Sequence, residues 1–396
     1  HAAARRHAEL QATESYMTAV IPFYTCAASL ERQRGEIDAL IDELFAGGSF
    51  TDGALVRRLE RRIALFTEAR HTIACGNATD ALTIMLMAAG VGPGDEVIVP
   101  SFSFFASASS IAHAGAKPVF VDIDPVTYAM DPTRISAAVT RHTRAVMPVH
   151  LFTQMADMPA IVDVARRHGL LVLEDSAEGI GMWLGGQHAG LIGDAGVLSF
   201  FPTKTLGAFG DAGMVLTNDD RLAEAARMLR NHGQREGEPQ VYRRLGFNSR
   251  MDSLQAAILL ARLGRLPQEI ARRAELAALY NRGLAGLSAS VSTPRIRRRP
   301  EGAGPVYYVY LIECEQRDAL AAHLAAEGIG TETYYPVPLH LQPCFRGLGY
   351  VRGDMPVAER ACTRTLGLPM YPDMTAGQVE RVCGAIADFF QRGGAR

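Results

Sequence analysis

The chain has 396 residues, 48% of them hydrophobic, so it is long enough to bury a large core and a smaller second one. Its 40 lysines and arginines against 42 acidic residues give a net charge of −2 with no long single-sign block, which argues against nucleic-acid and membrane-surface partners. Six cysteines without a CxxC pair argue against a metal site or disulfide framework, and no apolar run approaches the roughly 20 residues of a membrane span. These features favour a cytoplasmic enzyme.

The first part of the chain predicts two helices that lead into the fold. Residues 1–16 are charged and lack the apolar centre of a secretory signal, so we expect an expression remnant or a loose extension before a natural start at Met17. Apolar residues then recur at helical spacing over 31–45 and 52–66. We expect a large domain over 17–262 and a small one over 263–396.

Short apolar runs then alternate with helical stretches, which predicts an α/β fold with a mostly parallel sheet covered by helices. The predicted strands are 96–99, 117–121, 145–149, 170–174, 196–200 and 213–217. Sheets of this kind bind ligands at the carboxyl ends of their strands. The later segments are helices at 220–231, 252–263 and 267–284, an arginine-rich connector at 295–300, a strand at 306–313, and helices at 316–327 and 376–391.

Two segments of the first half could contribute to a binding site. Small, turn-prone residues over 75–82 run directly into a helical pattern, and backbone amides at such a start bind phosphate. The Thr79 hydroxyl could contribute, although an ordinary helix cap would look the same. Three phenylalanines follow the strand at 96–99, and one of them could stack on a ring while the others pack in the core.

The strongest chemical signal is the combination of Asp175 and Lys204, each of which follows a predicted core strand. A buried carboxylate needs a cationic partner, and a protonated pyridine nitrogen would be one. A lysine in a turn of small residues can form a Schiff base and then act as a general base. Alone, Asp175 could be a helix cap and Lys204 a surface lysine; together they indicate a cofactor site.

These motifs, in this order, resemble the DegT/StrS-like family of sugar-nucleotide aminotransferases over residues 21–390. The matching stretches begin with Gly-Asn-Ala-Thr-Asp-Ala-Leu at 76–82 and Glu-Asp-Ser-Ala-Glu at 174–178, and continue at 99–104, 199–204, 246–251, 335–343 and 368–372. The resemblance implies pyridoxal-phosphate fold type I, with a seven-stranded sheet in the large domain. It also implies the pyridoxal and pyridoxamine phosphate forms of the cofactor, and a homodimer with shared active sites.

Carried over position by position, the resemblance implies that Lys204 binds the cofactor as a Schiff base and that Asp175 pairs with the ring nitrogen. Further cofactor contacts would come from Asn77, Ala78, Thr79, Phe104, Glu178 and Ser199. Asn248 would reach the phosphate in the neighbouring subunit. Substrate contacts would come from Arg250, Tyr335 and His340, with a surface ion pair as the alternative for Arg250.

The resemblance implies transfer of an amino group from glutamate or glutamine to a nucleotide-linked keto sugar, for a secondary metabolite or a surface glycan. Many relatives have Gln or His where this chain has Glu178, and the glutamate form favours C4 of dTDP-4-keto-6-deoxyglucose or a close relative over C3. An ionised Glu178 beside the ring hydroxyl would be repelled, so we expect a proton or a hydrogen bond there.

Three other readings compete with a sugar-nucleotide aminotransferase. Dehydratases of the same family have His at the lysine position, so Lys204 argues against that activity. A non-catalytic regulator would need the catalytic set to be eroded, and the set is intact. An amino-acid aminotransferase would need an arginine for the substrate carboxylate, and the many arginines leave this possibility open.

Overall fold

The computed structural model describes residues 20–297 and 304–393, and its central element is a seven-stranded sheet. The strand order is β1-β9-β8-β5-β4-β2-β3, and all neighbours are parallel except β9, which runs antiparallel to β1 and β8. The α/β fold with a mostly parallel sheet is therefore confirmed. The strands are β1 (His71–Cys75), β2 (Glu96–Pro100), β3 (Lys117–Val121), β4 (Thr143–Val146), β5 (Leu171–Asp175), β8 (Ala195–Ser199) and β9 (Gly213–Thr217).

Within the seven-stranded sheet, the strands differ from the predicted runs in two main places. Strand β1 was not predicted, although four of its five residues are buried. Strand β4 ends at Val146, three residues before the end of the predicted run, and Val149 forms only an isolated bridge with Asp175. Pro148 lies between them and has no N–H to continue a ladder, which explains the early end.

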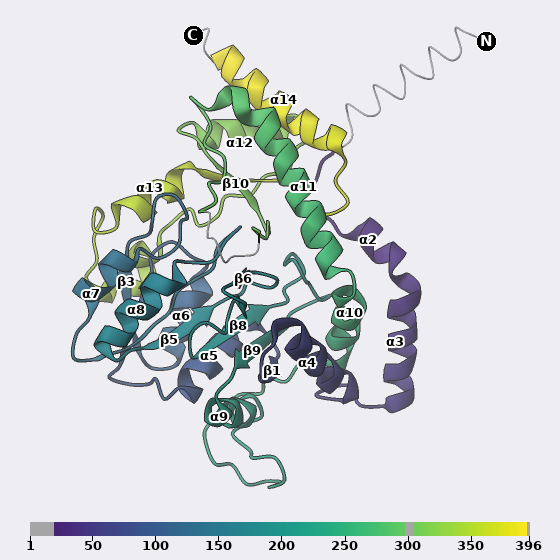
Figure 1. Cartoon of the computed structure of the whole chain (residues 1–396), viewed down its shortest axis with the longest axis vertical. Helices are drawn as coiled ribbons and strands as arrows, with labels where there is room; N and C mark the ends of the chain where they lie inside the picture. Colours follow the sequence, from purple (N-terminus) through teal and green to yellow (C-terminus); the bar gives the residue numbers. More distant parts are fainter. Residues whose placement is uncertain (1–19, 298–303, 394–396) are drawn as a thin grey trace.

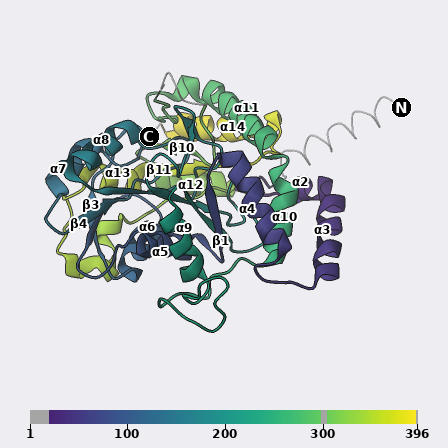
Figure 2. The ribbon, with the colours of Figure 1, turned by 60° about the horizontal axis from the view of Figure 1, so that its bottom comes forward.

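Helices cover both faces of the sheet (Figures 1 and 2). Because side chains alternate along a strand, Ile73 packs on one face and the next residue, Ala74, packs on the other. The first face is covered by α5 (Ala78–Ala88), α6 (Phe105–His113) and α9 (Asp220–Arg230). The opposite face is covered by α4 (Ala54–Thr67) and α10 (Ser253–Leu263) over β8 and β9, and by α7 (Ile135–Ala138) and α8 (Met158–His168) over β2 to β5.

The carboxyl-terminal half forms a second hydrophobic cluster around a two-stranded sheet, β10 (Tyr310–Glu313) with β11 (Thr365–Leu368). Ile21, near the start of the described chain, pairs with Ile329 and packs in this cluster. The division into domains at residue 263 stays a prediction. The elements not yet named are α2 (Ala27–Arg32), α3 (Arg34–Gly47), β6 (Trp183–Leu184), β7 (Gln187–His188), α11 (Leu266–Leu284), α12 (Arg317–Ala326), α13 (Pro356–Arg364), α14 (Ala376–Gly393) and four short 3₁₀ turns.

The predicted helices agree with the observed ones within a few residues, but the strand predicted at 306–313 is only its second half, β10. Residues 306 and 308 instead donate their amides to the carbonyls of Thr153 and Phe152, between β4 and α8. Residues 1–16 and the second half of the arginine-rich connector, 298–300, lie outside the described residues. Arg297, at its described end, pairs with Asp124 at 2.6 Å. In the described part of the chain, no helix is long and apolar enough to cross a membrane.

A buried arginine of helix α11 binds three backbone carbonyls of the carboxyl-terminal half. Nη1 of Arg273 donates to the backbone oxygens of Tyr307 and Tyr308 at 3.1 Å each and to that of Met370 at 2.9 Å. Burial lowers the pKa of Arg273, and the three carbonyls replace part of the hydration that its guanidinium loses. The residue thereby fixes the backbone of Tyr308, whose hydroxyl contacts that of Thr203, in the segment after β8, at 3.2 Å.

We expect Arg273→Met to lower the free energy of unfolding by about 3 kcal/mol, because buried carbonyls would lose their donor. Denaturant unfolding measures this change. Arg282→Met, at an exposed position of the same helix, is the control and should change stability by less than about 0.5 kcal/mol. Equal effects of the two substitutions would contradict this account of Arg273.

Candidate active site

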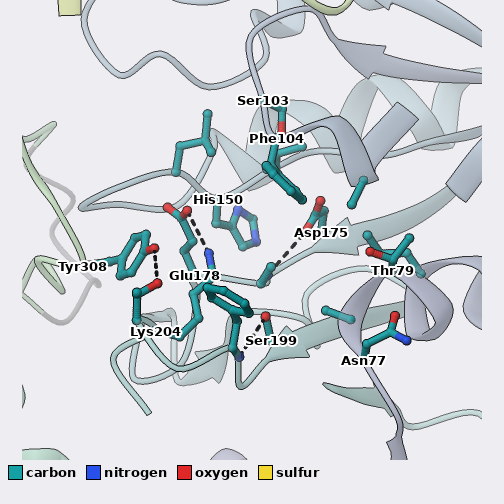
Figure 3. A pocket seen from close by; sticks show the side chains of 18 of the residues that line it. Asn77, Thr79, Ser103, Phe104, His150, Asp175, Glu178, Ser199, Lys204 and Tyr308 are labelled. Carbon is teal, nitrogen blue, oxygen red and sulfur yellow. Dashed lines mark hydrogen bonds and ion pairs between the residues drawn. The ribbon is translucent and has the colours of Figure 1, made fainter. Parts of the chain in front are cut away.

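A cavity of about 400 Å³ lies where the carboxyl ends of β1, β2, β4, β5 and β8 meet. Asp175 and Lys204 both line it, as the sequence required (Figure 3). The other predicted residues that line it are Asn77, Ala78, Thr79, Phe104, Glu178, Ser199 and Tyr335. Segments far apart in the sequence therefore converge on one site at the edge of the sheet that parallel topology favours.

One side of the cavity is the amino terminus of α5. Asn77 caps this helix by accepting a hydrogen bond from the Asp80 amide at 2.7 Å. The first amides of the helix, those of Ala78 and Thr79, have no partner within the helix and suit an anion. Gly213 allows this approach, because a Cβ atom there would lie 2.6 Å from the Ala78 nitrogen.

Asp175 is the last residue of β5 and is 4% exposed. Its Oδ2 accepts a hydrogen bond from the Ser107 hydroxyl at 2.6 Å, and its Oδ1 accepts a longer one, 3.2 Å, from the Ala177 amide. Burial raises the pKa of Asp175 above its ordinary value, and these hydrogen bonds oppose the shift without cancelling it. A cation placed in the cavity would stabilise the ionised form.

Lys204 faces Glu178 and Tyr308 on the other side of the cavity (Figure 3). Its Nζ lies 3.1 Å from Glu178 Oε1 and 4.3 Å from the centre of the Tyr308 ring. Burial alone would lower the pKa of Lys204, but Glu178, Tyr308 and Asp175 outweigh burial and raise it. The other oxygen of Glu178 accepts a hydrogen bond from the Phe152 amide at 2.7 Å, so both oxygens of this carboxylate have partners within the protein.

The chain contains only two lysines, Lys117 and Lys204. Lys117 begins β3 at the edge of the sheet, where its half-exposed amine pairs with Glu96 at 3.1 Å. Lys204 therefore supplies the amine of the cavity in a chain that otherwise uses arginine for its positive charges. The scarcity of lysine in the sequence was a further signal that could have pointed to Lys204.

The remaining predicted cavity residues differ in exposure. Phe104 is 62% exposed, whereas Phe102 is fully buried and contacts Tyr335 ring to ring at 5.2 Å. The Ser199 hydroxyl accepts the Phe201 amide at 3.3 Å, and its own proton can be donated into the cavity. Burial raises the pKa of Tyr335 well above its ordinary value, so its hydroxyl stays neutral.

Sequence reasoning missed His150, which lines the cavity after β4. Its Nδ1 accepts the Ala156 amide at 3.2 Å, so the proton is on Nε2, which donates to Glu174 at 2.8 Å. Glu174 is fully buried and also accepts amides from the loop after β7, Gly190 among them. The position of His150 directly after a predicted strand was a usable signal, because Asp175 was found in the same way.

Three predicted residues do not line the cavity. Asn248 is exposed and accepts a hydrogen bond from Arg250 at 2.8 Å. Arg250 also donates to Asn231 at 2.9 Å. His340 is buried behind the cavity, where its two ring nitrogens contact Ser101 Oγ at 2.5 Å and Glu359 at 3.2 Å. All three therefore have hydrogen-bond partners outside the cavity, and the Asn248 side chain is exposed at the surface of the described chain.

Comparison with known proteins gives matches over almost the whole chain. The model of the DegT/DnrJ/EryC1/StrS aminotransferase family matches residues 31–387. A pleiotropic regulatory protein from Geobacillus stearothermophilus is 48% identical, covering 94% of this chain and 99% of that protein. UDP-2-acetamido-2-deoxy-3-oxo-D-glucuronate aminotransferase from Pseudomonas aeruginosa is 40% identical, covering 93% of this chain and 100% of the enzyme.

Solved structures agree with these matches. DesV from S. venezuelae, in complex with a ketimine intermediate, superimposes with a TM-score of 0.89 at 39% identity, covering 94% of this chain and 99% of that one. NtdA from Bacillus subtilis, solved with the bound cofactor PMP, superimposes with a TM-score of 0.84 at 32% identity, covering 91% and 82%. Both neighbours hold a cofactor-derived group, so the cavity can be compared with what pyridoxal phosphate requires.

We expect Gly213→Ala to weaken the affinity for pyridoxal 5′-phosphate by at least about tenfold, because the new methyl group would push the start of α5 away from β9. The dissociation constant of the cofactor-free protein, measured by fluorescence titration, gives the answer. Gly264→Ala is the control, since a Cβ atom there meets nothing within 4 Å. An unchanged affinity in Gly213→Ala would show that the close approach of α5 is not needed.

Proposed function

The chain belongs to the DegT/DnrJ/EryC1/StrS aminotransferase family, whose enzymes depend on pyridoxal phosphate. From this premise we propose that it transfers an amino group from glutamate or glutamine to the keto carbon of a nucleotide-linked sugar. The observation that supports this most is the meeting of Asp175 and Lys204 in one cavity. The reaction would serve amino-sugar biosynthesis for a secondary metabolite or a surface glycan.

The residues of the cavity fit pyridoxal phosphate. Asp175 is a buried carboxylate with no cation from the described residues in direct contact, which suits a protonated ring nitrogen. The free amides at the start of α5 suit the phosphate. When bound, the cofactor supplies a carbonyl carbon that exchanges amino groups and a ring that withdraws electrons.

Each group would have a separate task in holding the cofactor. The amides of Ala78 and Thr79 and the hydroxyl of Ser199 would bind the phosphate. The Asp175 carboxylate would keep the proton on the ring nitrogen, since separating the two charges in a buried site costs free energy. Phe104 would cover the ring face, and the exposure of its side chain in the single chain leaves it available for this contact.

Lys204 would bind the cofactor covalently and move the proton during amino transfer. Glu178 and Tyr308 keep its amine at one place, and they favour the protonated form of Nζ. The amine can act as a base only after Nζ has lost its proton. Because the Glu178 carboxylate stabilises the protonated form, it makes this loss harder. Glu178 is in this respect a partner of the lysine as well as a neighbour of the ring hydroxyl.

Two observations bear on the carbon that receives the amine. Glu178 alone favours C4, whereas the P. aeruginosa relative is named for a 3-oxo sugar. A whole-length relative outweighs one side chain, so we propose C3 and keep C4 of a dTDP-4-keto-6-deoxyhexose as the alternative. The half-exposed tyrosines of the cavity would contact the sugar, with Tyr335 among them.

The protein would act as a homodimer, in which Asn248 of one subunit reaches the phosphate of the cofactor bound by the other subunit. The exposure of Asn248 outside its own cavity supports this arrangement, and the bond from Arg250 would orient its amide. His340 would then support the site indirectly, through Ser101. The cytoplasmic location that the scattered cysteines favour also remains part of the proposal.

A second candidate is a regulator without catalytic activity, because the G. stearothermophilus relative is named for regulation. The intact pair of Asp175 and Lys204 favours the enzyme instead. An assay for the amino-sugar product separates the two candidates, since a regulator would release none.

The experiment is to incubate the protein with glutamate and either a UDP-linked 3-keto sugar or dTDP-4-keto-6-deoxyglucose, and to locate the new amine by NMR. We expect an amine at C3, a yellow protein as purified, and at least about a thousandfold loss of turnover in Lys204→Ala. Lys117→Ala should keep full activity. Lys117 begins the edge strand β3, so its amine is at the opposite end of the strands from the cavity. An amine at C4 would overturn the C3 assignment alone, and turnover by Lys204→Ala would overturn the proposed mechanism.

A further inference from the structure

Two serine hydroxyls connect the wall of the cavity to Asp175. Ser107, in α6, is fully buried and donates to Oδ2 of Asp175 at 2.6 Å. The hydroxyl of Ser103, which lines the cavity, lies 2.7 Å from the hydroxyl of Ser107. Figure 3 shows Ser103 and Asp175 among the side chains around the cavity. The three groups form a continuous chain of hydrogen bonds.

The direction of the protons in this chain follows from the carboxylate. An ionised Asp175 can only accept, so the Ser107 proton points to it. The Ser107 oxygen must then accept the proton of Ser103, which fixes the order Ser103 to Ser107 to Asp175. Each donor in such a chain is polarised by the next bond, and this strengthens the bond that ends on the carboxylate.

The bond from Ser107 is the shorter of those that Asp175 receives, since the Ala177 amide lies 3.2 Å away. The Ser107 hydroxyl comes from helix α6 and reaches Oδ2, whereas the Ala177 amide lies in the loop after β5 and reaches Oδ1. Without the bond from Ser107, a carboxylate that burial already disfavours would lose its main donor and would be free to rotate.

We propose that Ser107 is a positioning residue, which keeps Asp175 ionised and oriented toward the ring nitrogen of the cofactor with support from the Ser103 hydroxyl. The inference rests on the proposed role of Asp175 as the partner of that nitrogen. Ser107 acts through Asp175 and does not itself line the cavity. Its substitution should therefore weaken cofactor binding only while the carboxylate is present.

The test is the dissociation constant of pyridoxal 5′-phosphate for the cofactor-free full-length protein, by equilibrium dialysis from micromolar to millimolar cofactor. Ser107→Ala should bind about tenfold more weakly, because it removes a hydrogen bond to a charged group. The control is Ser110→Ala, which removes another buried hydroxyl of α6 that donates only to the Ser107 carbonyl, at 3.3 Å. This control should bind within about twofold of the wild type.

A double-mutant cycle shows whether the effect passes through Asp175. In an Asp175→Asn background, Ser107→Ala should change the dissociation constant by less than about twofold. The inference is overturned if Ser107→Ala binds like the wild type, if Ser110→Ala shows the same loss, or if the full loss persists with Asn at 175. Failure of the wild type itself to bind the cofactor would instead refute the proposed function.

Discussion

The site depends on one electrostatic constraint, a carboxylate buried at the end of a central strand. Within the part of the chain that the structure describes, Asp175 has hydrogen-bond donors but no cation in direct contact, and burial raises its pKa. The sheet sets this arrangement, because a parallel strand in its middle is covered on both faces and ends beside the starts of helices. The free energy cost of burial would be recovered when a cation binds, and in the proposed function that cation is the protonated ring nitrogen of the cofactor.

The lysine side of the cavity has the opposite balance. Lys204 has Glu178 and the face of the Tyr308 ring beside it, so its charge is stabilised before any ligand arrives. Tyr308 comes from the carboxyl-terminal half, and Arg273 binds its backbone oxygen. The position of the Lys204 amine therefore depends on packing between the two halves of the chain, and not only on the turn that contains it.

Much of this could be predicted because local signals and topology agree. Asp175 and Lys204 each follow an apolar run, and alternating strands and helices bring the ends of such runs to one edge. Tyr308 could not be found in this way, since it lies in a run that looks like a core strand and its role depends on the fold of another segment. The same limit applies to Ser107, whose contact with Asp175 joins residues 68 positions apart. His340 lies in a family-like motif, yet its ring nitrogens are bonded behind the cavity.

The most direct test of the account is to find which amine holds the cofactor. Borohydride reduction of the wild-type protein loaded with pyridoxal phosphate converts the carbon–nitrogen double bond into a stable single bond, and peptide mass mapping then locates it. The two lysines of the chain lie in separate peptides, so the result is unambiguous. The account predicts the adduct on the peptide that contains Lys204 and none on that of Lys117. An adduct on Lys117 alone, or no adduct in a protein that binds the cofactor, would contradict it.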